Sequence, residues 1–268
     1  MRSGISLSAD QLPGGETAVR TGARSPSLVP ADVIAALEAG QPSVNHMEQI
    51  AIDMGVLLCK VFPIAAADAE RLRGPGLVKK MAIGGQILYE HYGRDAWGLA
   101  RSHPSDTVRG WGAMAIAAEF PMTLAESLNL MLPFADDPHF AVREWAWLAQ
   151  RRRVIDETEA ALAELGAWAR ANSPRVRRFA SEVTRPRGVW SAHIPELKAE
   201  PGMALELLDL LRADPSPYVQ DSVGNWLNDA SKSKPDWVRE VCAAWSIPGS
   251  ARATERICRR ALRSIGDP

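Results

Sequence analysis

Residues Pro138-His139-Phe140-Ala141-Val142-Arg143 contain a Val-Arg pair that recurs at a regular interval along the chain, and this recurrence is the main evidence for the fold. Val108, Val142 and Val176 each precede an arginine and lie 34 residues apart. A fourth copy, Tyr218-Val219-Gln220, follows after 43 residues, so about nine extra residues separate it from the third. This periodicity indicates an internal repeat in which each copy is one structural unit.

The copies share the pattern of a helix with one buried side. Counted from each valine, the positions three, four and seven residues later are almost all apolar or small. The four sets are Val108, Trp111, Gly112, Ala115; Val142, Trp145, Ala146, Ala149; Val176, Phe179, Ala180, Val183; and Val219, Ser222, Val223, Trp226. This spacing places each set on one face of an α-helix.

A second helical pattern precedes the copies, for example at residues 158–171 and 203–213. Each unit is therefore predicted to be a helix pair that stacks on its neighbours. No segment alternates apolar and polar residues as a strand does. Further helices are predicted at residues 32–39, 46–61, 235–245 and 252–265. The sequence predicts an all-α fold, a HEAT-like repeat solenoid (α-α superhelix) with a concave groove.

Length and composition fit one folded domain, since 46% of the 268 residues are apolar. The longest apolar run, residues 50–64, contains Asp53 and Lys60 and is shorter than the roughly 20 residues of a membrane span. Residues 1–28 are rich in Gly, Ser, Thr and Pro and lack the apolar block of a secretory signal. We expect a disordered leader at 1–28, a folded domain at 29–268 and a cytoplasmic location, without membrane association.

The three cysteines form no close pair, and the five histidines show no ligand spacing. Gly84-Gly85 is not followed by the lysine of a phosphate-binding loop. We therefore predict no disulfide, no metal and no cofactor.

Charge is unevenly distributed although the net charge is only −1. Residues 170–187 hold six arginines against the single acid Glu182, and residues 252–263 hold five arginines against Glu255. Local basic faces are compatible with this pattern, whereas nucleic-acid binding through the overall charge is not.

Two carboxylates depart from the repeat pattern. Glu182 follows its valine by six residues and Asp229 follows its own by ten, which places both on one flank of their helices. If these helices are neighbours, both carboxylates point into the same groove, where paired acids suit stabilisation of a cationic transition state. The alternative is structural: Asp229 caps the turn at Ser231, and Glu182 pairs with Arg178 or Arg185.

Arg178 and Arg185 lie opposite the core stripe and are expected to face solvent, where they would hold phosphates. Pro186 disfavours helix at the preceding residue, so a loop is predicted at the groove edge, with Trp190 as a stacking surface for a base. Alternatively, Trp190 packs against its own insertion. Arg151 and Arg152 belong to a basic triplet that either contacts phosphate or is a solvated helix end, and Trp147 either lines the groove or covers a neighbouring helix.

Three stretches carry a resemblance to a known family. They are residues 176–182 (Val-Arg-Arg-Phe-Ala-Ser-Glu), 184–190 (Thr-Arg-Pro-Arg-Gly-Val-Trp) and 218–229 (Tyr-Val-Gln-Asp-Ser-Val-Gly-Asn-Trp-Leu-Asn-Asp). They resemble the AlkC branch of the DNA alkylation repair glycosylases, and the likeness runs from about Val29 to Ile265. The Arg-Pro-Arg insertion makes it specific, because generic HEAT arrays lack it.

The resemblance implies excision of cationic alkylated purines, notably 3-methyladenine, from double-stranded DNA by a base-excision repair enzyme of the monofunctional glycosylase type. It implies active-site roles for Glu182, Asp229 and Trp190, with Glu144 a weaker candidate. It also implies phosphate contacts with little sequence specificity and a shallow groove without a deep pocket. The expected DNA-binding residues are Arg177, Arg178, Arg185, Arg187, Arg151, Arg152, Lys232 and Lys234. We expect a monomer with no obligate protein partner, and no C-terminal immunoglobulin-like domain in this chain.

Two other functions remain open at this point. One is a HEAT-repeat DNA-binding relative without catalysis. The other is a scaffold for protein partners, which gains support if Arg177, Arg178 and Arg185 are tied up in ion pairs within the chain.

Overall fold

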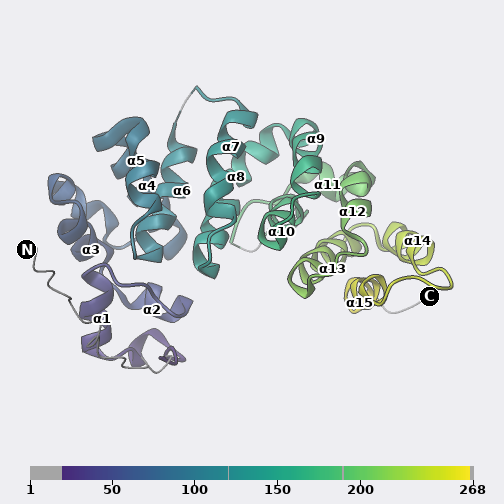
Figure 1. Ribbon diagram of the computed structural model, residues 1–268, viewed down its shortest axis with the longest axis horizontal. Coiled ribbons are helices and arrows are strands. Elements are labelled where there is room, and N and C mark those ends of the chain that lie inside the picture. Colours follow the sequence, from purple (N-terminus) through teal and green to yellow (C-terminus); the bar gives the residue numbers. More distant parts are fainter. Residues whose placement is uncertain (1–19, 120, 189, 266–268) are drawn as a thin grey trace, which may run out of the picture.

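The computed structural model describes residues 20–119, 121–188 and 190–265, and within these ranges it contains helices and no strand. The helices follow one another along an arch, with the two ends of the described chain at opposite ends of it (Figure 1). The α-helices are α1 (Ala31–Glu38), α2 (His46–Ala51), α3 (Met54–Val61), α4 (Leu77–Tyr92), α5 (Ala96–Arg101), α6 (Asp106–Ala118), α7 (Leu124–Ala135), α8 (Phe140–Asp156), α9 (Thr158–Trp168), α10 (Pro174–Val183), α11 (Pro195–Ala199), α12 (Leu205–Leu211), α13 (Pro217–Ser231), α14 (Pro235–Trp245) and α15 (Arg252–Leu262). Four 3₁₀ segments join them: Pro26–Leu28, Pro63–Leu72, Gly93–Asp95 and Pro201–Ala204.

The predicted repeat is confirmed. Its four copies form α6, α8, α10 and α13, each of which packs on the next along the arch. The positions at offsets 0, 3, 4 and 7 from each valine are all buried. Outer helices α5, α7, α9, α12 and α14 pack against this inner row, so that each unit is a helix pair as in a HEAT-like array.

Two of the predicted helices are divided in the structure. The helix expected at residues 46–61 is two helices, because the Asp53 side chain accepts the backbone N–H groups of Gly55 and Val56 and starts α3. The helix expected at 203–213 begins as a 3₁₀ turn and continues as α12.

The arginine of the Val-Arg pair braces the turn between repeats. Arg177 donates to the carboxylate of Asp214 at 2.6 and 3.0 Å and to the carbonyls of Ala171 and Asn172. Arg109 makes the same set of bonds, with Asp137 as its carboxylate. Turn carbonyls need a partner when the units stack, and these guanidinium groups supply it.

The N-terminal helices are pinned to the inner row by one buried carboxylate. Asp106 of α6 accepts hydrogen bonds from the backbone and hydroxyl of Ser43 and from Gln49. The His139 ring also bonds the Ser43 carbonyl oxygen. This contact brings α2 to the start of α8. Of the leader expected at residues 1–28, the structure describes residues 20–28, with a 3₁₀ segment at Pro26–Leu28 and Arg20 paired to Glu48, whereas residues 1–19 lie outside the described residues.

None of the described helices is both long enough and apolar enough to cross a membrane.

Candidate functional site

A cavity of about 390 Å³ opens on the inner side of the arch between α8, α10 and α13. The sequence had led us to expect a shallow groove. His46 of α2 and Trp190 of the insertion, whose rings contact each other edge-on, also line the cavity. The complete lining is His46, Glu144, Trp145, Trp147, Leu148, Arg178, Glu182, Arg185, Trp190, Tyr218, Asp221, Ser222 and Asn225.

Six of the thirteen lining residues come from two rows of the repeat, at offsets 2 and 6 from each valine. These rows are Glu144 and Leu148 on α8, Arg178 and Glu182 on α10, and Asp221 and Asn225 on α13. We call offsets 2, 6 and 9 the groove-facing positions. On α10 a residue at these positions is shielded from bulk solvent, because α8 and α13 pack on either side of that helix.

The expectation that Arg178 and Arg185 face solvent is therefore wrong. Arg178 is only 9% exposed, and its guanidinium lies 5.1 Å from the ring centroid of Tyr218. The Arg185 side chain is mostly buried as well. Both guanidinium groups are paired with carboxylates within the chain.

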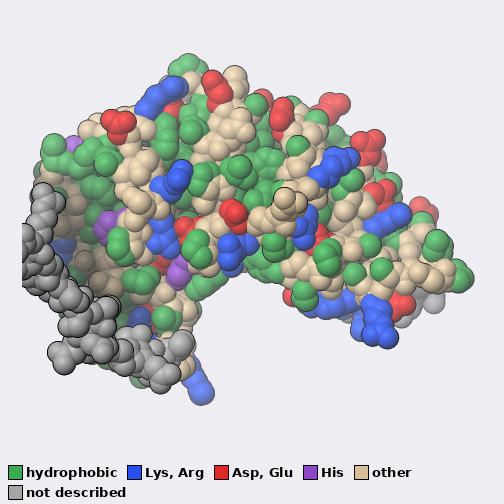
Figure 2. Space-filling view, viewed as in Figure 1, with side chains coloured by type: hydrophobic (Ala, Val, Ile, Leu, Met, Phe, Trp, Pro, Cys, Tyr) green, Lys and Arg blue, Asp and Glu red, His purple; other side chains and the backbone are tan. Residues whose placement is uncertain are grey.

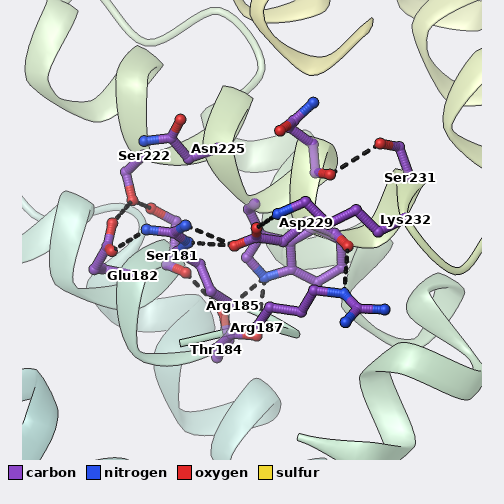
Figure 3. A network of polar contacts seen from close by, with 12 residues as sticks. Ser181, Glu182, Thr184, Arg185, Arg187, Ser222, Asn225, Asp229, Ser231 and Lys232 are labelled. Atoms are coloured by element: carbon purple, nitrogen blue, oxygen red, sulfur yellow. Dashed lines mark hydrogen bonds and ion pairs between the residues drawn. The ribbon is translucent and has the colours of Figure 1, made fainter. Parts of the chain in front are cut away.

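Charges alternate along a buried chain of ion pairs. Arg178 pairs with Glu144 at 2.8 Å and with Glu182 at 3.3 Å. Arg185 in turn pairs with Glu182 at 2.6 Å and with Asp229 at 2.6 Å (Figure 3). Lys232 ends the chain with a 2.9 Å bond to Asp229. Removal of an interior member, Arg178, Glu182 or Arg185, would take one partner from each of two neighbouring charges.

Glu182 is ionised at neutral pH. Burial alone raises the pKa of its carboxyl group, but Arg178, Arg185 and the Ser222 hydroxyl outweigh that effect and hold the pKa below its usual value. Ser222 donates to Oε2 of Glu182 at 2.7 Å and accepts from Ser181 at 2.7 Å. The cavity thus contains a fixed anion whose orientation is set by three donors.

Asp229 does not line the cavity, contrary to the prediction that both carboxylates point into one groove. It is 4% exposed and lies behind Arg185, which contacts it through Nε and Nη2 (Figure 3). It does not cap Ser231 either, since that hydroxyl donates to the carbonyl of Asn228. The alternative that Glu182 pairs with Arg178 or Arg185 is confirmed, because it pairs with both.

Trp190 lies on the rim of the cavity and is 61% exposed. Its ring meets His46 edge-on, with 6.1 Å between centroids. Its backbone φ of 60° is a left-handed conformation, which costs a non-glycine residue roughly 1–2 kcal/mol. Strain of this kind is concentrated at functional sites.

Trp147 lines the cavity, which decides between its two predicted positions. Its indole Nε1 donates to Oε2 of Glu144 at 2.7 Å. The sequence analysis did not single out the other seven lining residues as functional: His46, Trp145, Leu148, Tyr218, Asp221, Ser222 and Asn225. Asp221 and Asn225 were detectable from the repeat, because they occupy the same two rows as Arg178 and Glu182.

Arg151 is not a solvated helix end. It is buried and donates to three carbonyls of the insertion, those of Val183, Arg185 and Ala192, at 2.6 to 3.0 Å. Burial and the neighbouring Arg185 lower the pKa of Arg151 to about 10. Its position is that of an anchor that holds the Trp190 loop on α8.

The other predicted DNA-binding residues differ in accessibility. Arg177 braces a turn, and Arg187 donates to the carbonyl of Asp229 and to the hydroxyl of Ser233. Arg152, Lys232 and Lys234 are exposed, although Arg152 pairs with Asp156. A role in DNA binding stays a prediction for the whole set.

Residues 144–264 match the family described as DNA alkylation repair enzyme. The uncharacterized protein YhaZ of Bacillus subtilis (strain 168) is 40% identical over 126 residues, which cover 47% of this chain and 32% of YhaZ. This chain therefore spans about a third of that relative's length.

Two solved structures have a similar fold. One is Pseudomonas fluorescens alkylpurine DNA glycosylase AlkC, bound to DNA containing an abasic site analogue, with a TM-score of 0.64, 24% identity and coverage of 90% of this chain and 64% of that chain. The other is AlkD2 from Streptococcus mutans, with a TM-score of 0.61, 22% identity and coverage of 78% and 100%. The residues that match the family include every cavity residue except His46. Residues 144–264 of this chain thus match the family described as DNA alkylation repair enzyme, and its HEAT-like helical array has the same fold as AlkC and AlkD2.

Proposed function

We propose that this protein acts in DNA alkylation repair as a monofunctional glycosylase that hydrolyses the N-glycosidic bond of cationic alkylated purines such as 3-methyladenine. The observation that carries the proposal is the buried, ionised Glu182 in a cavity rimmed by the exposed ring of Trp190. The family match over the same residues supports it.

The chemistry of the substrate suits such a site. A purine alkylated at N3 already carries a positive charge, so it leaves without protonation by an acid. Cleavage then develops positive charge on the deoxyribose, and a fixed carboxylate stabilises that charge where water is excluded. Aromatic side chains at the rim give the lesion nucleotide a stacking surface.

The ion pairs limit which mechanism the carboxylates support. Both oxygens of Glu182 have donors, from Arg185 on Oε1 and from Ser222 and Arg178 on Oε2. Electrostatic stabilisation and orientation of a water molecule fit this geometry better than nucleophilic attack, because donors on both oxygens make the carboxylate less nucleophilic while each oxygen can still accept a further hydrogen bond. Asp229 would act through Arg185, as a residue that positions the guanidinium beside Glu182.

The test is release of free bases from methylated duplex DNA by the purified protein, with the products identified by chromatography. The proposal expects 3-methyladenine among the products, and the same run shows whether 7-methylguanine is also released. Absence of any released base, with DNA binding intact, would contradict it.

That contrary result would favour a DNA-binding relative without catalysis. One observation favours this second candidate: each acid of the site, Glu144 included, is already paired with a cation of the chain. The pairing of Arg177, Arg178 and Arg185 also fits a scaffold for protein partners, as the sequence analysis anticipated.

A further inference from the structure

The last helix is a fifth copy of the repeat that the sequence pattern did not reveal. Thr254, Ile257, Cys258 and Ala261 of α15 are all buried and stand at the spacing 0, 3, 4 and 7 of the other copies. Thr254 follows Val219 by 35 residues, close to the interval between the first three copies. It replaces the valine and lacks the arginine after it, so the Val-Arg signature is absent, but α15 packs on α13 as the next inner helix.

This register fixes which side chains of α15 occupy the groove-facing positions. Offsets 2, 6 and 9 are Arg256, Arg260 and Arg263. On α13 the same positions hold Asp221, Asn225 and Asn228, and on α6 they hold Gly110, Met114 and Ala117. Of the five inner helices in the repeat, only α15 has arginine at all three positions. We call Arg256, Arg260 and Arg263 the arginine row.

The arginine row adjoins the cavity. Arg256 and Arg260 contact Asp221 at 2.8 and 3.1 Å, and Arg263 donates to Asn225 at 3.2 Å. Asp221 and Asn225 line the cavity, so the row begins where the cavity ends.

The row carries excess positive charge. Within the described residues, the one carboxylate paired with it is Asp221, which is shared by two of the three guanidinium groups. Burial and the neighbouring Arg260 lower the pKa of Arg263, as expected for crowded cations. Space-filling Figure 2 shows Lys and Arg side chains gathered on the underside of the C-terminal end, where α15 lies in Figure 1.

These contacts contrast with those of the arginines predicted to hold DNA. Arg178 and Arg185 are buried between carboxylates, and their charges are neutralised inside the chain. The arginine row is partly exposed and outnumbers its acid, so its charge is available to an anion. The row extends over about 10 Å of helix, the axial length of about three phosphates on one DNA strand.

We propose that Arg256, Arg260 and Arg263 bind consecutive phosphates of the DNA backbone beside the lesion and align the duplex with the cavity. The inference rests on the proposed function, since it takes DNA as the partner. Phosphate contacts fix register without reading sequence, so the row confers affinity and orientation and no base preference.

The test is the affinity for a short fluorescein-labelled undamaged duplex, measured by anisotropy at several salt concentrations. The triple variant Arg256→Gln, Arg260→Gln, Arg263→Gln is compared with a charge-matched control, Arg101→Gln, Arg170→Gln, Arg212→Gln, whose exposed arginines follow outer helices. Each lost phosphate contact lowers the slope of log affinity against log salt by about 0.9. We expect the row variant to lose two to three such contacts and the control to lose none.

Two further variants separate binding from folding. Arg→Lys at the same three positions keeps the charge, and we expect it to restore most of the salt dependence. Asp221→Asn removes the shared acid, and we expect it to tighten binding severalfold because two guanidinium groups are released.

A folded row variant that binds with unchanged affinity and slope would overturn the proposal, as would Asp221→Asn with weaker binding. This failure is distinct from failure of the proposed function. If the wild-type protein releases methylated bases and the row variant binds DNA as tightly as wild type, the proposed glycosylase activity stands and the role of the arginine row is rejected. If the wild-type protein releases no base but its DNA binding depends on the row, the role of the arginine row stands and the proposed glycosylase activity is rejected.

Discussion

Ser222 on α13 donates a 2.7 Å hydrogen bond to Glu182 on α10, and both side chains are buried. Ser222 stands at offset 3, where the three preceding copies have Trp111, Trp145 and Phe179. A fourth aromatic ring would fill the space beside the Glu182 carboxylate. The exchange of an aromatic residue for serine therefore gives the buried anion both room and a donor.

Ser222→Ala should move the acid limb of the excision pH profile to higher pH. Without the hydroxyl, the pKa of Glu182 rises, so the carboxylate is protonated sooner as the pH falls. Ser181→Ala is the matched control, because Ser181 donates to Ser222 and makes no bond to Glu182. Identical acid limbs in wild type and Ser222→Ala would exclude this role.

Arg178→Met should destabilise the fold by about 3–5 kcal/mol, because it leaves buried Glu182 and half-buried Glu144 without their shared cation. Urea unfolding followed by circular dichroism measures this. The compensated variant Arg178→Met, Glu144→Gln, Glu182→Gln should recover most of the loss. Equal destabilisation in both variants would show that the cost is steric.

The free energy of unfolding should decrease at acidic pH because Glu182 becomes protonated. Its folded pKa lies below the ordinary 4.5, so its contribution is fully present above about pH 4.5 and is lost as the pH falls through the folded value. Glu182→Gln should lower stability at neutral pH and flatten its dependence on pH in that acidic range. If the stability of Glu182→Gln depended on acidic pH as strongly as that of wild type, other carboxylates would be responsible for the loss of stability in acid.

Trp190→Ala should lower base release about tenfold while leaving the unfolding free energy within about 0.5 kcal/mol of wild type, as is usual for an exposed side chain. Trp190→Phe should keep most of the activity, since a ring remains on the rim. If Trp190→Ala unfolded more easily by several kcal/mol, the ring would be a structural element of the insertion.

The repeat made the fold predictable. Its interval and buried offsets identified α6, α8, α10 and α13, and the extra residues after the third copy marked the insertion that carries Trp190. Glu182 and Asp229 were singled out as departures from the repeat, and Trp190 as part of the insertion; Glu182 and Trp190 line the cavity, whereas Asp229 does not.

The environment of the arginines was not predictable in the same way. A helical wheel gives the direction of Arg178 relative to its own core stripe, but Tyr218 and Glu144, which cover it, come from neighbouring helices. Arg151 is bonded to carbonyls of the insertion, and α2, which carries His46, is held by Ser43 and Gln49 on Asp106. Such contacts join distant segments and leave no local pattern.

The most direct measurement is the single-turnover rate of 3-methyladenine release from methylated duplex DNA by wild type and Glu182→Gln, with Glu159→Gln on outer helix α9 as a control for the loss of one exposed carboxylate. We predict release by wild type and the control, and a rate at least about a hundredfold lower for folded, DNA-binding Glu182→Gln, the size of effect usual for one electrostatic group. Release by Glu182→Gln at the wild-type rate would contradict the assignment of the buried carboxylate as the catalytic anion.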